Sequence, residues 1–313
     1  PPPAAAHDAP GHGALRVVSP GILALIQDAG RRGLSDAGVS LSGALDRQAL
    51  AAANELVGNA RGAAVIEAIS VGVDLEAVAD AVVAVVGEGT AVTRVHAGES
   101  VPQNVGSPFA LTIGDRLRMD SVGGLRCWIA VRGGIAAPRS LGSRSADTLS
   151  GLGPAPLRAG DVIPVGDEIA GAVLLALPAS PRASSAGAVT LRVILGPRDD
   201  WFTADAVGRL LGAEWQVDAR SNRVGIRLSA AGGGTAPIER AITRELASEG
   251  VVAGSIQVPS DGDPILFLAD HPVTGGYPVI AVVVAEDLGL AAQCAPGARV
   301  RFTRVAPGAR GTS

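Results

Sequence analysis

The segment RCWIAVRG, residues 126–133, joins an apolar run directly to a charged turn that contains glycine. β-Branched and aromatic residues bounded by turn formers are typical of a β-strand. Six further segments of this kind lie along the chain: LRVV (15–18), DAVVAVVG (80–87), GAVLLAL (171–177), LRVILG (191–196), PILFLAD (264–270) and PVIAVVVA (278–285). The sequence therefore predicts a mainly β protein.

Two short helices interrupt this pattern. The first has apolar residues at helical spacing, namely Leu45, Ala49, Ala53 and Leu56. Ser42 or Asp46 can cap its start, and residues 58–59, Gly-Asn, can end it. We expect the second helix to begin at Thr203 and to end near Gly212.

The length of 313 residues favours two domains, and two paired similarities suggest a duplication. The similar segments are LRVVSPG (15–21) with LRVILGP (191–197), and GVSLSGA (38–44) with GIRLSAA (225–231). Chance similarity between short Gly- and Val-rich segments is the alternative. A Pro-, Ser- and Ala-rich connector, PASPRASSAGA (178–188), marks the expected boundary. The predicted organisation is a disordered leader (1–13), an N-terminal domain (14–180) and a C-terminal domain (189–306).

Composition narrows the function classes. Hydrophobic residues make up 47% of the chain, yet charges or glycines interrupt every apolar run before it reaches bilayer-spanning length. The first 13 residues do not resemble a signal peptide, so we expect a cytoplasmic protein. A net charge of −4 is unsuited to nucleic-acid binding. Cys127 and Cys294 lack a Cys or His at metal-ligand spacing, which favours reduced, buried thiols and no metal site.

All 26 basic residues are arginines, because the chain contains no lysine. This excludes a phosphate-binding lysine, a Schiff-base lysine and a biotinylated lysine within this chain. Any bound phosphate or carboxylate must be held by arginine or by backbone amides, and the planar guanidinium suits such anions.

Three polar clusters are candidates for a site. The first, QDAGRRGLSDAGVSLSGALDRQALAAANELVGN (27–59), contains Asp28, Arg31, Ser42, Asp46, Arg47 and Asn54 among several glycines. Such a loop is expected close to a polar ligand, with a salt-bridged surface turn as the alternative. The second, VRGGIAAPRSLGSRSADT (131–148), places Arg132 and Arg144 near Gly133 and Gly134. It predicts an anion site, with a β-bulge beside solvated arginines as the alternative.

The third cluster follows the predicted strand ILFLA (265–269) and contains Asp270, His271, Thr274, Gly275 and Tyr277, with Gln257 upstream. Loops at strand ends commonly carry binding groups. His271 is a candidate general base, and a polar turn residue is the alternative. Asp270 with Thr274 suits an Asx-type turn equally well. Arg223, in SNRVGIR (221–227), is expected to approach the same cleft if the duplication is real.

These clusters together resemble the family variously named allophanate hydrolase subunit 2, biotin-dependent carboxyltransferase domain, and 5-oxoprolinase C subunit of the KipA type. The matching segments run in family order through roughly residues 15–305: PGILALIQDAGRRG, GVSLSGALDRQALAAANELVGN, IAVRGGI, LGSRS, DWFT, SNRVGIRL, SEGVVAGSIQVPSDGDPILFLAD and TGGYPVIA. The resemblance implies two cyclophilin-like β-barrel domains. It also implies a heteromeric complex with a KipI-type partner, the B component of 5-oxoprolinase, and with a LamB/YcsF-type A component.

The family implies three functions. One branch opens 5-oxoproline to glutamate with ATP and Mg²⁺, and we favour it because this chain carries no biotin carboxylase or carrier segment. A second branch is the carboxyltransferase component of urea carboxylase, which receives CO₂ from biotin on another protein. The third function is that of a regulatory binding subunit without catalysis.

Within this resemblance, our hypothesis assigns roles to the clusters. Arg31, Arg132 and Arg144 hold phosphate or carboxylate. The amides of Gly133 and Gly134 stabilise an oxyanion. Catalytic orientation of substrate, water or Mg²⁺ is assigned to Asp28, Asp46 and Asp270, with Arg132 as the fourth catalytic residue. The remaining substrate-binding candidates are Ser42, Arg47, Asn54, Arg223, Gln257, Thr274, Gly275 and Tyr277.

Overall fold

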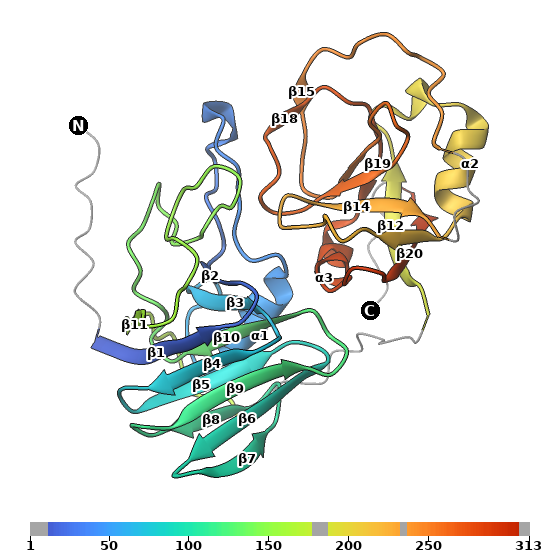
Figure 1. The fold of residues 1–313 in the computed structure, drawn as a ribbon. Coiled ribbons are helices and arrows are strands. Elements are labelled where there is room, and N and C mark those ends of the chain that lie inside the picture. Colours follow the sequence, from blue (N-terminus) through green and yellow to red (C-terminus); the bar gives the residue numbers. More distant parts are fainter. Residues whose placement is uncertain (1–11, 177–186, 232–236, 307–313) are drawn as a thin grey trace, which may run out of the picture. The chain divides into compact units, whose positions relative to one another are not determined.

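The computed structural model describes residues 12–176, 187–231 and 237–306 (Figure 1). Most of the predicted leader, residues 1–13, and most of the connector, residues 178–188, therefore lie outside the described residues. No helix within the described ranges combines the length and the apolar character needed to cross a membrane.

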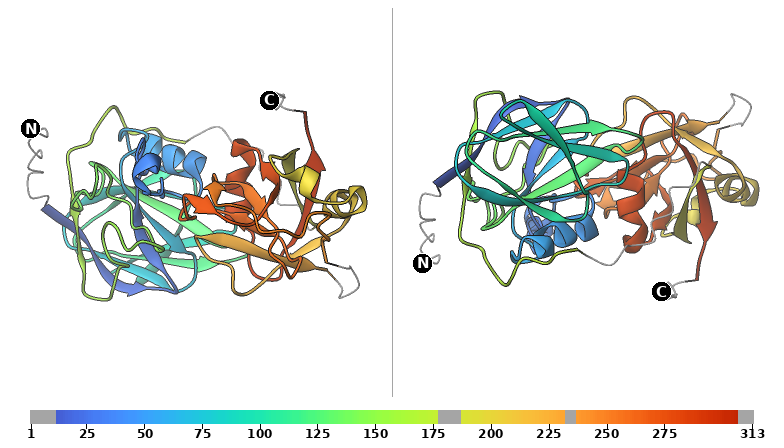
Figure 2. Two further views of the ribbon diagram at one scale, coloured as in Figure 1. Left: turned by 90° about the horizontal axis from the view of Figure 1, so that it is seen from above. Right: turned by 90° about the horizontal axis from the view of Figure 1, so that it is seen from below.

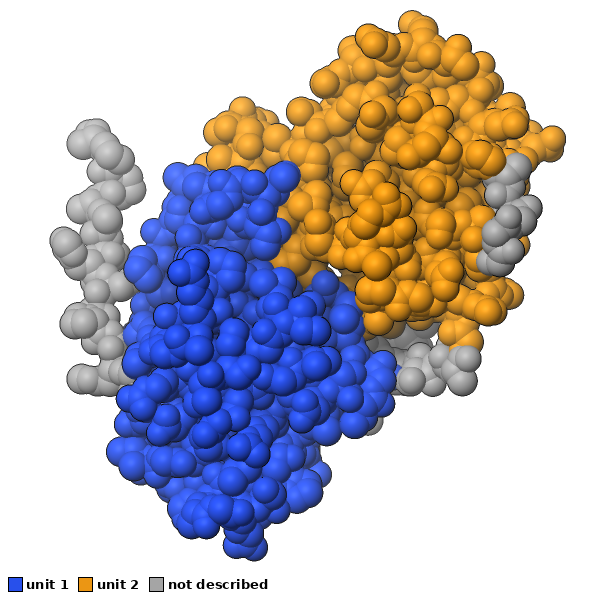
Figure 3. All heavy atoms as spheres, viewed as in Figure 1, with its two compact units in different colours: residues 1–31, 47–181 blue, residues 32–46, 182–313 orange. Residues whose placement is uncertain are grey.

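The chain divides into two compact units, coloured separately in Figure 3. The first comprises residues 1–31 and 47–181, and the second comprises residues 32–46 and 182–313. The predicted ranges were contiguous, whereas this division gives residues 32–46 to the second unit. The chain thus leaves the first unit after Arg31 and returns to it at Arg47.

Two antiparallel sheets build the first unit. The six-stranded sheet has the order β11-β1-β4-β9-β6-β7, with strands β1 (His12–Pro20), β4 (Val73–Ala77), β6 (Thr90–His96), β7 (Glu99–Gln103), β9 (Arg116–Ser121) and β11 (Val162–Val165). The five-stranded sheet has the order β2-β3-β10-β5-β8, with strands β2 (Ala24–Gln27), β3 (Val65–Ile69), β5 (Ala81–Val86), β8 (Pro108–Leu111) and β10 (Arg126–Val131).

Strand β10 shows why its sequence is apolar without alternation. Cys127, Ile129 and Val131 enter a core that also contains residues of the six-stranded sheet, such as Leu15 and Leu117. Successive side chains of a strand point to opposite faces, so the residues between them face the other way. Helix α1 (Arg47–Leu56) packs against β5 and β10 (Figures 1 and 2). Both faces of β10 are therefore covered, and all six of its residues are buried.

A closed barrel forms the second unit. Its strands follow the order β12-β19-β16-β17-β14-β13-β20 and comprise β12 (Val189–Leu195), β13 (Trp215–Val217), β14 (Gly225–Ala230), β16 (Ser255–Gln257), β17 (Ile265–Phe267), β19 (Val279–Val283) and β20 (Arg299–Arg304). A separate pair joins β15 (Glu249–Gly250) to β18 (Thr274–Gly275). Helices α2 (Ala204–Gly212) and α3 (Leu288–Ala292) contribute to the barrel's core, and the 3₁₀ turns are η1 (Ser35–Ala37), η2 (Asp199–Trp201) and η3 (Ala285–Asp287).

The prediction of a mainly β protein is confirmed, as are both predicted helices. Thr203 is the N-cap of α2, where its side chain accepts a hydrogen bond of 3.1 Å from the amide of Ala206. The barrel of the second unit agrees with the expected fold class. The short helix α3 had no counterpart in the sequence analysis.

The predicted strand GAVLLAL is wrong for residues 171–176, which form no strand. The amide of Leu174 donates to the carbonyl of Leu56 at the end of α1, at 3.0 Å, and Leu175 is 90% exposed.

The sequence similarity of residues 38–44 to residues 225–231 does not correspond to a shared local structure. Residues 225–230 form β14, whereas residues 38–44 contain no strand.

Residues 32–46 contribute a hydrophobic anchor to the second unit. Leu45 is 6% exposed and belongs to the barrel's core. Ser42 precedes it with a φ of 50°, a conformation that side chains other than glycine seldom adopt. Residues 32–46 are therefore held in the second unit by the packing of Leu45 as well as by polar groups.

Replacing Leu45 by Ala should lower the free energy of unfolding by about 2–4 kcal/mol, because the substitution leaves a cavity in the barrel core. The matched control is Leu175→Ala, which removes the same atoms from an exposed position and should change stability by less than about 0.5 kcal/mol. Urea unfolding of the full chain measures both values. Equal effects of the two substitutions would contradict this placement of Leu45.

Candidate functional site

Asp28 lies at the end of β2 and gathers four donors around its buried carboxylate. The hydroxyls of Ser143 and Ser145 donate at 2.6 and 2.5 Å. The amides of Arg144 and Gly30 donate at 2.7 and 2.8 Å. This network joins the first polar cluster of the sequence to the second.

Two opposing effects act on the pKa of Asp28. Burial disfavours the ionised carboxylate, and the hydrogen bonds from Ser143, Ser145 and the amides of Arg144 and Gly30 outweigh it. The pKa of Asp28 therefore lies below its ordinary value. Asp28 therefore holds the loop after β10 through the hydrogen bonds from Ser143, Arg144 and Ser145.

Arg31 extends the same network with a guanidinium that is 2% exposed. Its Nε donates to the carbonyl of Ser140 at 3.1 Å, and its Nη2 donates to the carbonyl of Ser145 at 2.5 Å. Among the residues that the structure describes, its buried Nη1 has no hydrogen-bond partner. Donor capacity is thus left over at this position.

Arg144, the second predicted anion-binding arginine, forms an ion pair. Its Nη1 lies 2.9 Å from Oε1 of Glu168, an oxygen that Arg139 Nη2 also approaches at 2.7 Å. Sequence reasoning missed Glu168, which follows β11 in a stretch without a recognisable motif. The pairing leaves Arg144 less suited to an external phosphate than its sequence context indicated.

The glycine pair after β10 is also engaged internally. The amide of Gly133 donates to Oδ1 of Asn59 at 2.7 Å, and the amide of Gly134 donates to the carbonyl of Val131 at 2.9 Å. The side chain of Asn59 in turn donates to Oδ1 of Asn54 at 3.0 Å. The geometry therefore argues against an oxyanion-binding role for these amides, and it makes Asn54 a structural residue.

Arg132 fastens a loop to the end of α1. Its Nη1 donates to the carbonyl of Val57 at 2.7 Å and to that of Gly171 at 3.2 Å. Gly58 permits this approach, because a Cβ there would lie 2.5 Å from the same nitrogen. Arg47, in the first turn of α1, is similarly occupied by the carbonyl of Ala29, at 3.2 Å. These arginines hold backbone segments together.

In the second unit, Asp270 and Arg223 form a buried ion pair. Arg223 donates from Nε to Oδ2 of Asp270 at 2.9 Å and from Nη2 to Oδ1 at 3.0 Å. The hydroxyl of Ser42 donates to the same carboxylate at 2.7 Å, and Arg223 also holds the carbonyl of Gly43, at 2.7 Å. Arg223 thus contacts the first polar cluster through the carbonyl of Gly43.

Asp46, the last residue of the segment 32–46, lies against α3. A Cβ on Gly289 of this helix would lie 2.7 Å from the Asp46 carboxylate carbon. Glycine at this position therefore leaves room for the buried acid, which is 1% exposed. Asp28, Asp46 and Asp270, the three acids expected to orient substrate or Mg²⁺, are distributed over three different environments. Within the described ranges, no group of three or more His, Cys, Asp or Glu residues is placed to hold a metal ion.

The third cluster forms a smaller group beside the barrel. Gln257 Nε2 donates to the carbonyl of Tyr277 at 2.9 Å. A Cβ on Gly275 would lie 2.4 Å from that nitrogen, so glycine permits the contact. Thr274 and Gly275 form β18. The ring of His271 stacks on Phe267 and its Nδ1 lies 2.7 Å from the carbonyl of Pro272, which favours a structural role over that of a base.

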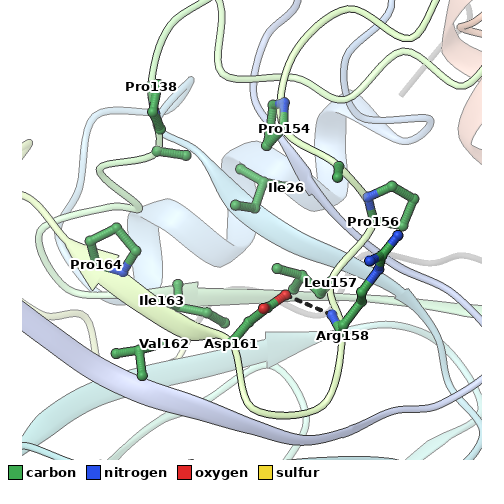
Figure 4. Close-up of a pocket in the computed structure, with 12 residues that line it drawn as sticks. Ile26, Pro138, Pro154, Pro156, Leu157, Arg158, Asp161, Val162, Ile163 and Pro164 are labelled. Atoms are coloured by element: carbon green, nitrogen blue, oxygen red, sulfur yellow. Dashed lines mark hydrogen bonds between the residues drawn. The ribbon is translucent and has the colours of Figure 1, made fainter.

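A groove of about 410 Å³ lies in the first unit and was not indicated by the sequence. Figure 4 shows Pro138, Pro154, Pro156 and Pro164 around it, and Ile26 and Leu157 also line it. Its wall at residues 154–157 continues directly from Gly153, where a Cβ would lie 2.8 Å from Arg31 Nη2. The groove and the Arg31 network therefore share one loop.

Lowering the pH should reduce the cost of replacing Asp28 by Asn. Because its pKa is depressed in the folded state, the contribution of Asp28 to stability is fully present above the unfolded-state pKa of about 3.9 and is lost as the pH falls through the folded-state value. Unfolding free energies of both proteins should differ most near neutral pH and converge in acid. The control Asp167→Asn replaces an exposed acid and should change stability by less than about 0.5 kcal/mol. A pH-independent penalty for Asp28→Asn would contradict the assignment.

Replacing Arg132 by Ala should destabilise the first unit by about 1–3 kcal/mol, because two backbone carbonyls lose a charged donor. The catalytic role assigned from the sequence predicts instead a protein that folds normally and loses turnover. The control Arg16→Ala removes an exposed arginine that pairs with Glu76. Thermal unfolding of the two variants decides, since a stable but inactive Arg132→Ala protein would restore the catalytic assignment.

The chain is similar to known proteins over most of its length. A family model for the carboxyltransferase domain, subdomain A and B, matches residues 37–304. The C subunit of Escherichia coli 5-oxoprolinase is 31% identical over 297 residues, which cover 93% of this chain and 91% of that protein. Urea amidolyase of Saccharomyces cerevisiae is 29% identical over 309 residues, which cover 92% of this chain but 16% of that protein.

Solved structures are also similar to this chain over nearly its whole length. The crystal structure of TTHA0988 matches with a TM-score of 0.80 and 35% identity, and covers 94% of this chain and 57% of that one. The urea carboxylase of Kluyveromyces lactis matches with a TM-score of 0.83 and 25% identity, and covers 96% of this chain and 28% of that one. The chain therefore spans only part of both structural relatives.

Proposed function

The chain belongs to the carboxyltransferase-domain family, subdomains A and B, and from this premise we propose that it acts as the C subunit of a 5-oxoprolinase, which opens 5-oxoproline to glutamate. The observation that carries the proposal is the extent of similarity. The match covers 91% of the Escherichia coli 5-oxoprolinase C subunit and 88% of its Haemophilus influenzae counterpart. Urea amidolyase, by contrast, is matched over 16% of its length.

The proposed reaction needs an activated lactam, since an amide in a five-membered ring is stable in neutral water. ATP would supply that activation by phosphorylating the lactam oxygen. Two of the three arginines expected to hold phosphate or carboxylate are engaged within the chain. Arg144 pairs with Glu168, and Arg132 donates to the carbonyls of Val57 and Gly171. We therefore assign nucleotide binding to a KipI-type partner and substrate binding to this chain.

A second function, carboxyl transfer in a urea carboxylase, is favoured by one observation. The Kluyveromyces lactis urea carboxylase matches 96% of this chain with a TM-score of 0.83. Biotin would have to be attached outside these 313 residues, because they contain no lysine. The partial coverage of that enzyme makes this the second proposal.

The deciding experiment combines this protein with its KipI-type and LamB/YcsF-type partners and measures glutamate release from 5-oxoproline. We expect release that requires ATP and stops when this chain is omitted. A parallel assay supplies urea, bicarbonate, ATP and a biotinylated carboxylase. Turnover confined to the second assay, or glutamate release without this chain, would contradict the proposal.

A further inference from the structure

We propose that Arg31 is the carboxylate-binding residue of a small-ligand site in the first unit. The identity of the ligand, 5-oxoproline, rests on the proposed function, whereas the existence of the site rests on the geometry around Arg31. Three features of that geometry matter: unused donors on Arg31, an uncompensated charge, and a second buried polar atom without a partner among the described residues, on Gln27.

The unused donors lie on one edge of the guanidinium. Arginine presents five N–H groups in a plane. Nε donates to the carbonyl of Ser140 and Nη2 donates to that of Ser145. These two hydrogen bonds occupy the edge of the guanidinium that Nε and Nη2 form. Nη1 is buried and has no partner among the described residues. The edge formed by Nη1 and the second Nη2 hydrogen therefore matches the two parallel oxygens of a carboxylate.

The charge of Arg31 is balanced only by neutral carbonyls. Asp28 is the nearest acid in the sequence, but its carboxylate accepts hydrogen bonds from Ser143, Ser145 and two backbone amides. No ion pair joins Arg31 to a carboxylate within the described part of the chain. A buried guanidinium without a counter-ion is unfavourable, so an anionic ligand would gain affinity here.

A second orphaned polar atom lies in the same network. Gln27 is fully buried, and its Nε2 donates to the carbonyl of Ala146 at 2.7 Å, next to the carbonyl of Ser145 that Arg31 holds. Its Oε1 has no donor among the described residues. A ligand with an N–H group beside its carboxylate can satisfy both atoms, and 5-oxoproline has this arrangement.

Gly153 packs closely against Arg31. This residue lies so close that an added Cβ would stand 2.8 Å from Nη2 and 2.0 Å from the carbonyl of Ser145. Residues 154–157, which follow it, form one wall of the groove in Figure 4. The other side of this loop is fixed by Asp147, whose carboxylate accepts from the amides of Leu149 and Ser150. A ligand that reaches Arg31 from the groove would therefore have to displace this loop at Gly153.

Calorimetric titration of the full chain tests the site without turnover. The probe is 5-oxoproline, and the matched control ligand is 2-pyrrolidone, the same ring without the carboxylate. We expect saturable binding of 5-oxoproline alone, weakened about tenfold or more by Arg31→Met. The control variant Arg16→Met, which alters an exposed arginine of the same unit, should bind like the wild type.

Arg31→Met could fail to fold, so a crystal structure of the wild-type protein with 5-oxoproline provides the second measurement. It should place the carboxylate within hydrogen-bond distance of Arg31 Nη1. A wild type that binds neither ligand, equal loss in both variants, or an ordered water in place of the carboxylate would overturn the inference. Binding at Arg31 without glutamate release by the complex would instead count against the proposed function alone.

Discussion

The buried ion pair between Asp270 and Arg223 is the interaction on which the arrangement of the chain depends. The side chains are 0% and 2% exposed, and such a pair is tolerated only when its remaining hydrogen-bonding groups are satisfied. Ser42 and Gly43 satisfy them from a segment far away in the sequence. Residues 32–46 thereby belong to the second unit, although the residues on either side of them belong to the first.

The same need for partners explains why polar clusters that resembled ligand sites became internal fastenings. Buried backbone N–H and C=O groups need hydrogen-bond partners, and in a loop these partners cannot come from a neighbouring strand. Asn59 accepts from the amide of Gly133, and Arg132 donates to carbonyls at the end of α1. Asp28 collects the donors of the loop after β10. Each side chain replaces the hydrogen bonds that a strand would have made, which is why the glycines and the polar residues occur together.

Local sequence was sufficient where a residue's role depends on its neighbours along the chain. The apolar run of β10 and the cap at Thr203 fall in this class. It was insufficient where the partner is distant. GAVLLAL has the composition of a strand, yet within it the amide of Leu174 donates to the carbonyl of Leu56. The pattern of apolar residues does not predict that Asp270 accepts a hydrogen bond from Ser42, or that Glu168 pairs with Arg144. In both cases the two partners lie far apart in the sequence, and no local motif connects them.

The two most buried arginines differ in how their charge is compensated, and this separates a structural residue from a candidate for ligand binding. Arg223 places its fork on the carboxylate of Asp270, so its charge and its geometry are satisfied within the chain. Arg31 is equally buried but donates only to carbonyls, and one nitrogen has no partner within the described ranges. Carbonyl dipoles stabilise a cation less completely than a carboxylate does. The difference in charge compensation, rather than burial or proximity to glycine, is therefore what distinguishes Arg31 from Arg223.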